Sequence, residues 1–148
     1  MRNEKITVIL TDDDREEHLL FKEVVAEFEA IGSLISFEQG DALLDYLKKE
    51  HLKETHLLFL DLNMPSLSGF DCLSQIRANH SLGRLKILIY STSSAEKDIE
   101  ETFLHGADFY ITKPCDFRKM KDMFEQVLKI DWNAHSKAHS IQGFKFKS

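Results

Sequence analysis

The sequence predicts an α/β fold in which a doubly wound, five-stranded parallel sheet carries helices on both faces. Five short apolar runs alternate with five stretches of helical periodicity, a pattern typical of repeated βα units. Three of these runs, at 6–10, 57–60 and 87–90, are almost continuously apolar, as expected for central strands covered on both faces. With 148 residues, the chain is long enough for one domain with a substantial core.

Each element can be placed along the chain from its apolar spacing. Strands are expected at about 5–11, 34–37, 56–60, 86–90 and 108–112. Helices are expected at about 15–30, 42–49, 69–79 and 95–105, and from residue 116 onwards. Short connections and right-handed crossovers between parallel strands then limit the topology to a flavodoxin-like sheet with five helices.

The helices differ in how clearly their apolar residues keep helical spacing. The first two helices carry Leu20, Phe21, Val24, Val25 and Phe28, and then Leu43, Leu44 and Leu47. The last helix has the longest apolar stripe, made of Phe117, Met120, Phe124, Val127 and Leu128. The fourth helix is the weakest, because its first half is polar and it adds only Ile99, Phe103 and Leu104. We therefore expect the fourth helix to be exposed and loosely held.

The composition argues against several classes of protein. The net charge of −6 argues against a nucleic-acid partner, because phosphate contacts need clustered Lys and Arg. No apolar stretch approaches the ~18 residues that span a bilayer, and residues 1–5 lead into a strand without a signal peptide. Cys72 and Cys115 form no CxxC pair, which favours free thiols in a reducing compartment. We therefore expect a cytoplasmic protein with neither nucleic acid nor membrane as partner.

Polar residues follow four of the five predicted strands. Asp12 and Asp13 follow the first strand, Asp61 the third, Ser91 the fourth and Lys113 the fifth. Because parallel strands all end at one edge of the sheet, where open α/β folds bind their ligands, these side chains should converge. Three carboxylates, a hydroxyl and a lysine at one edge suit a divalent cation and a phosphoryl group.

The acidic run after the first strand has two interpretations. Asp14, with Glu17 three residues later, fits a capping box at the start of a helix. A cap needs only one carboxylate, which leaves Asp12 and Asp13 without a structural reason. Two carboxylates about 4 Å apart repel by roughly 4 kcal/mol at an effective dielectric constant near 20, so a cation such as Mg²⁺ would relieve the crowding.

Asp61, Ser91 and Lys113 also have ordinary interpretations as a turn aspartate, a turn serine and a surface lysine before a proline. Their presence together favours chemistry instead. A carboxylate beside a metal ion can act as a nucleophile and become an aspartyl phosphate. Lys113 can pair with that carboxylate at rest and with phosphoryl oxygens later, and the Ser91 hydroxyl can reach a phosphoryl oxygen.

Four motifs occur in order along the chain: VILTDDD, LFLDLNMPSLSGFD, ILIYSTSS and GADFYITKP. On these motifs, about residues 5–129 resemble the receiver domains of two-component response regulators, the chemotaxis-regulator-like family. The resemblance implies the strand order 2-1-3-4-5. It also implies a phosphorylation-activated signalling switch of a two-component system or phosphorelay.

The resemblance implies a role for each residue of the predicted site. Asp61 would be the phosphoacceptor, and it would hold Mg²⁺ together with Asp13 and the backbone carbonyl of Asn63. Asp12 would act largely through metal-bound water. Lys113 would neutralise the phosphoryl group.

The resemblance further implies a rearrangement beyond the site. Ser91 would move toward the phosphoryl group and Tyr110 would swing into the space that it vacates. This movement would reshape the surface of the fourth helix, the fifth strand and the fifth helix for partner binding. The peptide bond between Lys113 and Pro114 is expected to be cis.

The phosphodonor would be a phosphohistidine on a sensor histidine kinase or a histidine phosphotransfer protein, and the downstream target would be another protein. The chain would catalyse only its own phosphorylation and dephosphorylation, and would be a monomer or a phosphorylation-dependent homodimer. Two alternatives stay open. A phosphorylation-independent scaffold would typically lack some of the site residues, and an aspartyl-phosphate hydrolase would carry its nucleophile after the first strand and add a cap domain.

Residues 1–130 are expected to form the receiver domain, and residues 131–148 a C-terminal extension that is too short for a separate output domain. The i, i+4 spacing of His135 and His139 favours an exposed helix over a metal site, because no further ligand is near in sequence. Residues 144–147 alternate like an edge strand or a docking segment, and disorder is equally compatible with them.

Overall fold

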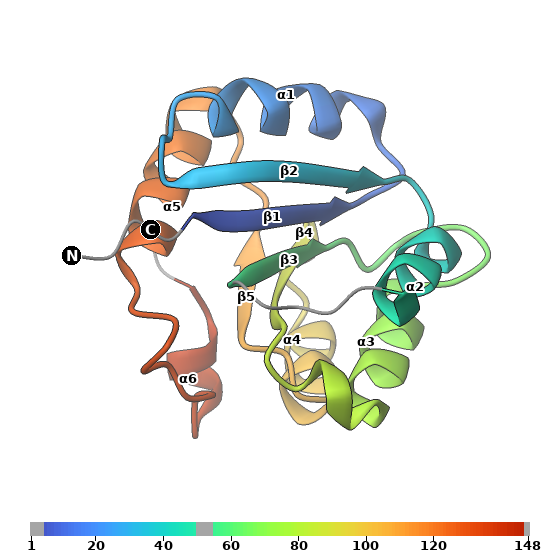
Figure 1. Ribbon diagram of the computed structural model, residues 1–148. Helices are drawn as coiled ribbons and strands as arrows, with labels where there is room; N and C mark the ends of the chain where they lie inside the picture. Colours follow the sequence, from blue (N-terminus) through green and yellow to red (C-terminus); the bar gives the residue numbers. More distant parts are fainter. Residues whose placement is uncertain (1–4, 50–54, 147–148) are drawn as a thin grey trace.

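A five-stranded parallel sheet forms the centre of the molecule (Figure 1), in a computed structural model that describes residues 5–49 and 55–146. The strands lie in the order β2-β1-β3-β4-β5, and each is parallel to its neighbours. Their bounds are β1 Ile6–Thr11, β2 Ile31–Phe37, β3 His56–Leu60, β4 Lys86–Ser91 and β5 Phe109–Thr112. The predicted sheet and its strand order are confirmed. The expectation about a signal peptide falls mainly on residues 1–4, outside the described residues.

Five long helices link and cover the strands: α1 Arg15–Val25, α2 Gly40–Lys49, α3 Gly69–Ala78, α4 Glu96–Leu104 and α5 Phe117–Lys129. One face of the sheet carries α1 and α5, and the other carries α2, α3 and α4 (Figure 1). Two short elements were not predicted, the 3₁₀ turn His80–Leu82 and the helix α6, Ile141–Phe144. Within the described ranges, no helix has the length and apolar character needed to cross a membrane.

The first helix is shorter and the second strand longer than predicted. Ala26 caps α1, and Phe28 lies beyond it in a turn, where its N–H donates to the carbonyl of Val25 at 3.0 Å. Phe28 still packs on the apolar core, so helical spacing of apolar residues continues past the helix end. β2 starts at Ile31 because it pairs there with Ile6 of β1.

The core lies in two apolar clusters, one on each side of the sheet. Along β1, Val8 and Leu10 belong to the cluster with α1 and α5, whereas Ile9 belongs to the cluster with α2, α3 and α4. All three side chains are fully buried, and each contributes roughly 1.5–3 kcal/mol by leaving water. Burial on both faces explains the continuous apolar runs and fixes the positions of the strand ends.

The extension after α5 packs along the outer edge of the sheet, at β5. Trp132 is 5% exposed, and its indole N–H donates to a backbone carbonyl of α5 at 3.1 Å. The ring of His135 lies 5.2 Å from that of Phe109, and its Nε2 lies 3.2 Å from a carboxylate oxygen of Asp108. Residues 132–134 form a turn and residues 135–140 have no helical structure, so the expected exposed helix is wrong there. These aromatic and polar contacts outweigh the helical spacing of the two histidines.

Candidate functional site

The end of β1 brings two aspartates to the carboxyl edge of the sheet. Asp12 is fully buried, and its Oδ1 accepts the backbone N–H of Asp14 at 2.9 Å. The carbonyl oxygen of Asp12 lies 2.7 Å from Nε2 of His18. Asp13 is exposed. Asp14 caps α1 as predicted, but Glu17 does not complete the capping box, because the Asp14 N–H donates to Asp12 Oδ1 and the Glu17 side chain is buried.

Asp61 follows β3 and is only 6% exposed. Its N–H donates to the carbonyl of Thr11 at 3.0 Å, which joins the ends of β1 and β3. The loop after Asp61 turns back at once, because the N–H of Gly69 donates to the carbonyl of Leu62 at 2.9 Å. A β-carbon at Gly69 would meet the Asp61 carbonyl and would lie 2.7 Å from Leu62 Cα, so only glycine permits this approach. Asn63 lies exposed in this loop.

Ser91 and Lys113 lie at the ends of β4 and β5. Ser91 is fully buried, and its carbonyl accepts the backbone N–H of Lys113 at 2.8 Å. The Nζ atom of Lys113 lies 2.8 Å from Asp12 Oδ2 and 3.9 Å from Asp61 Oδ1. None of the described peptide bonds is cis, so the expectation of a cis bond at Pro114 is wrong. Trans is the intrinsically preferred form of such a bond, by only about 0.5–1 kcal/mol, so the residue pair alone does not decide the isomer.

The three aspartates form a compact acidic cluster. Asp12, Asp13 and Asp61 each place one carboxylate oxygen within 4.8 Å of the other two. Burial and the neighbouring Asp12 raise the pKa of Asp61 to about 6, although Lys113 acts in the opposite direction. One lysine cannot neutralise three carboxylates. The oxygen ligands and the excess negative charge therefore fit a hard divalent cation such as Mg²⁺.

Glu17 and Tyr90 also interact with Lys113, and neither was predicted to belong to the site. The ammonium group of Lys113 lies 5.7 Å from the centre of the buried Tyr90 ring. Burial and the carboxylate of Glu17 raise the pKa of Tyr90, and burial raises the pKa of Glu17. Burial alone would lower the pKa of Lys113, but its contact with Asp12 outweighs burial and leaves the pKa raised. The available signal was the position of Glu17 four residues before Phe21, on the apolar stripe of α1.

Ser93 connects Ser91 to Tyr110. The N–H of Ser93 donates to Ser91 Oγ at 3.1 Å, and the carbonyl of Ser93 accepts the Tyr110 hydroxyl at 2.8 Å. The hydroxyl of Ser93 donates to Asp98 in α4 at 2.6 Å. Tyr110 is 2% exposed, so this aromatic residue already lies inward and is linked to Ser91 through Ser93.

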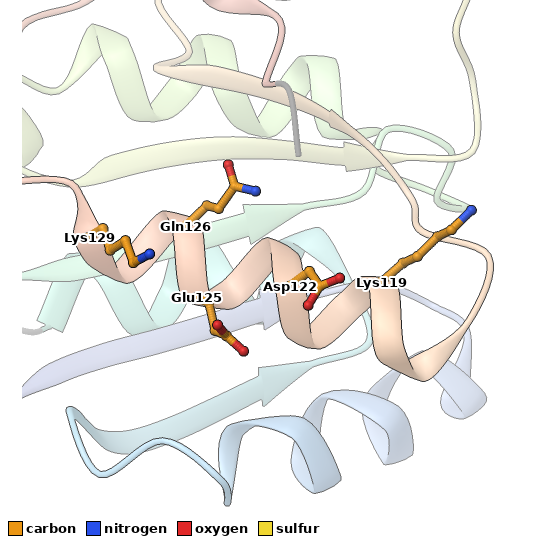
Figure 2. Close-up of a pocket in the computed structure, with 5 residues that line it drawn as sticks. All are labelled: Lys119, Asp122, Glu125, Gln126 and Lys129. Atoms are coloured by element: carbon orange, nitrogen blue, oxygen red, sulfur yellow. The ribbon is translucent and has the colours of Figure 1, made fainter.

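A hollow on the surface of α5 has none of the three aspartates in its lining (Figure 2). All of its lining side chains come from that one helix: Lys119, Asp122, Glu125, Gln126 and Lys129. Two positive and two negative groups give the hollow no net charge with which to select an ion. We therefore place the functional site at the carboxyl edge of the sheet.

Comparison with known protein families identifies the family of this chain. The response regulator receiver domain family matches residues 8–125, which is most of the chain. The chain belongs to this family. It is therefore the receiver domain of a two-component response regulator, a class of signalling switches and not of classical enzymes.

Two curated relatives match this receiver domain along most of their length. Response regulator Rcp1 of Synechocystis is 28% identical over 128 residues, which cover 84% of this chain and 85% of the relative. The probable methanogenesis regulatory protein FilR2 of Methanothrix harundinacea is 26% identical over 134 residues, which cover 85% of each chain. The name of Rcp1 agrees with the family assignment.

Solved structures of response regulators share the fold of this receiver domain. The Mn²⁺-bound form of Rcp1 gives a TM-score of 0.72 at 23% identity, covering 89% of this chain and 98% of that one. The phosphorylated cyanobacterial phytochrome response regulator RcpA gives a TM-score of 0.75 at 23% identity, covering 93% and 99%. At these identities the structures establish a common fold.

Proposed function

We propose that Asp61 accepts a phosphoryl group and that the receiver domain signals through the aspartyl phosphate. The observation that carries this proposal is the acidic cluster at the carboxyl edge, with Lys113 beside it. Mg²⁺ would be held by Asp13, Asp61 and the backbone carbonyl of Asn63, while Asp12 would act largely through metal-bound water. When bound, Mg²⁺ neutralises charge on the phosphoryl oxygens.

The transfer is an in-line attack of an Asp61 carboxylate oxygen on phosphorus. The donor is a phosphohistidine on a sensor histidine kinase or a histidine phosphotransfer protein. An O–P bond forms as the N–P bond breaks, and the leaving imidazole nitrogen keeps the electron pair and takes up a proton. Lys113, whose Nζ is 3.9 Å from Asp61 Oδ1, then pairs with the phosphoryl oxygens. Hydrolysis of the acyl phosphate, catalysed within the same domain, resets the switch.

Ser91 and Tyr110 transmit the change. The Ser91 hydroxyl oxygen accepts the N–H of Ser93, and on phosphorylation the Ser91 hydroxyl would donate its proton to a phosphoryl oxygen. Tyr110 is already inward, so phosphorylation strengthens its position at Ser93 instead of creating it. The surface of α4, β5 and α5 then binds a target protein or a second copy of the chain. In this proposal residues 1–130 form the signalling unit, and residues 131–148 form an extension of it.

Phosphorylation by a small phosphodonor tests the proposal. The protein is incubated with Mg²⁺ and phosphoramidate, whose N–P bond resembles that of phosphohistidine, and is quenched in acid within seconds for intact-mass analysis. We expect one added phosphoryl group on the wild type and none on Asp61→Asn or in excess EDTA. Asp14→Asn is the matched control and should react like the wild type, because Asn caps a helix as well as Asp does. Equal labelling of Asp61→Asn would refute the proposal.

A further inference from the structure

The last described part of the chain, the C-terminal segment (residues 141–146), packs directly against the inward tyrosine. The side chain of Phe144 is fully buried, and its ring lies 5.4 Å from Phe103 of α4 and 6.2 Å from Tyr110 of β5. The N–H of Phe146 donates to the carbonyl of Tyr110 at 2.9 Å. The segment therefore restrains both the ring and the backbone of Tyr110.

A continuous set of contacts leads from this segment to the acidic cluster. The Tyr110 hydroxyl donates to the Ser93 carbonyl at 2.8 Å, and the N–H of Ser93 donates to Ser91 Oγ at 3.1 Å. The carbonyl of Ser91 accepts the N–H of Lys113 at 2.8 Å. Each of these contacts is a direct hydrogen bond, so a displacement of Tyr110 would change the position of the Ser91 hydroxyl.

We propose that Phe144 is a positioning residue for phosphoryl binding at Asp61, acting through Tyr110 and Ser93 on the hydroxyl of Ser91. The proposal rests on the function proposed above. In the docked segment, Phe144 closes the space beside the Tyr110 ring and keeps the tyrosine hydroxyl on Ser93. Ser93 in turn donates its N–H to the Ser91 oxygen, which orients the Ser91 hydroxyl for donation to the phosphoryl group.

The expected sign of the effect follows from preorganisation. A hydroxyl that is already held in place gives up less conformational freedom when it binds an oxygen of the ligand. Loss of Phe144 would open space beside Tyr110 and release the tyrosine from Ser93, so Ser91 would have to be ordered during binding. Docking of the segment should therefore strengthen phosphoryl binding, and by linkage phosphoryl binding should tighten the segment on β5.

Beryllofluoride with Mg²⁺, a stable mimic of the phosphoryl group, measures this coupling without interference from hydrolysis. Its affinity is determined by calorimetry for the wild type, Phe144→Ala, Tyr110→Phe and the double variant. We expect each single variant to bind roughly five-fold or more weakly than the wild type. The double variant should bind no more weakly than the weaker single variant, because both substitutions interrupt the same set of contacts.

A control variant separates positioning from general destabilisation. Val24→Ala truncates a fully buried side chain in the cluster on the other face of the sheet, and it should bind beryllofluoride like the wild type. Phe144→Leu keeps an apolar side chain but loses the ring contacts with Phe103 and Tyr110, so it tests the proposal even if Phe144→Ala folds poorly.

The outcomes distinguish this inference from the proposed function. A wild type that binds beryllofluoride, with single variants that bind as tightly or more tightly, overturns the positioning role and leaves the phosphoacceptor intact. Additive losses in the double variant overturn it as well. A wild type that neither binds beryllofluoride nor reacts with phosphoramidate contradicts the proposed function, and the positioning role with it.

Discussion

Asp61 shows how a residue that serves the site opposes the stability of the fold. The residue is 6% exposed and lies close to Asp12, so burial and repulsion raise the pKa of its carboxyl group to about 6. The same raised pKa means that the ionised carboxylate is held at a cost in folding free energy. A cation or a phosphoryl group with its counter-charges would relieve that cost.

Asp61→Asn should therefore stabilise the cation-free protein in a pH-dependent way. The pKa of Asp61 is about 6 in the folded protein against an ordinary value of 3.8, and each pH unit of difference corresponds to about 1.4 kcal/mol. At pH 7.5 in EDTA, where the carboxyl is ionised in both states, we expect the variant to be more stable by up to roughly 3 kcal/mol. The gain should shrink as the pH falls below about 6 and vanish below about 4, where both states are protonated. Urea denaturation at several pH values measures it.

Asp14→Asn serves as the control for this experiment, because either residue can cap α1. Its stability should follow that of the wild type at every pH. A destabilised Asp61→Asn at pH 7.5, or a gain that does not change with pH, would contradict the electrostatic description of the cluster.

The polar residues that follow the strands could be predicted, and the other two residues that interact with Lys113 could not. Asp12, Asp61 and Lys113 follow apolar runs, and parallel strands bring such positions to one edge whatever the details of packing. Glu17 lies within the helical pattern of α1 and Tyr90 within the apolar run of β4. Such patterns do not specify which residue of another element a polar side chain will contact. Tyr90 approaches Lys113 through the pairing of β4 with β5, whereas Glu17 reaches them only through the packing of α1 on the sheet, which local periodicity does not specify.

At the scale of elements, the loop from β3 to α3 determines the backbone position of Asp61 at the end of its strand. Gly69 returns the chain against the backbone of Asp61 and Leu62, and Ser68 caps α3 by accepting the N–H of Asp71 at 3.2 Å. The close return leaves no room for a β-carbon at Gly69. The loop that carries the Asn63 carbonyl, the proposed metal ligand, is therefore anchored at both ends, at Leu62 and Gly69.

Gly69→Ala should destabilise the protein and disturb the site together. Its new methyl group would overlap the Asp61 carbonyl, and overpacking of this kind costs about 1–3 kcal/mol. Chemical denaturation should show this loss, and labelling by phosphoramidate should slow. Gly83→Ala is the matched control, because its β-carbon would approach nothing closer than the His80 carbonyl at 3.4 Å, an ordinary contact. Equal stability of the two variants would count against the tight return of the loop.

The C-terminal segment was the element least accessible to prediction. Residues 144–147 alternate in a way that fits an edge strand, and Lys145 does form an isolated bridge with Tyr110, while Lys147 lies outside the described residues. The preceding helix α6 has only four residues, too few for a periodic pattern. Its position depends on aromatic contacts of Phe144 with residues far away in sequence, which only the tertiary structure reveals.

At the scale of the whole molecule, hydrogen bonds through Tyr110, Ser93 and Ser91 connect the β5 edge of the sheet to its carboxyl edge. The Asp61 site lies where strands end, and the C-terminal segment lies along the outermost strand and packs on α4 (Figure 1). A target protein or a second copy that docks on the surface of α4, β5 and α5 would meet this segment. Partner binding and the state of Asp61 are thus expected to influence each other through Tyr110.

The most direct test of the central claim is to locate the phosphoryl group chemically. Borohydride reduces an acyl phosphate to an alcohol and so converts a phosphorylated aspartate into homoserine, which peptide mass spectrometry places in the sequence. After treatment with phosphoramidate and Mg²⁺, we predict homoserine at position 61 and at no other aspartate. Homoserine at position 12 or 13, or a phosphorylated protein that yields no homoserine, would contradict the assignment of Asp61 as the phosphoacceptor.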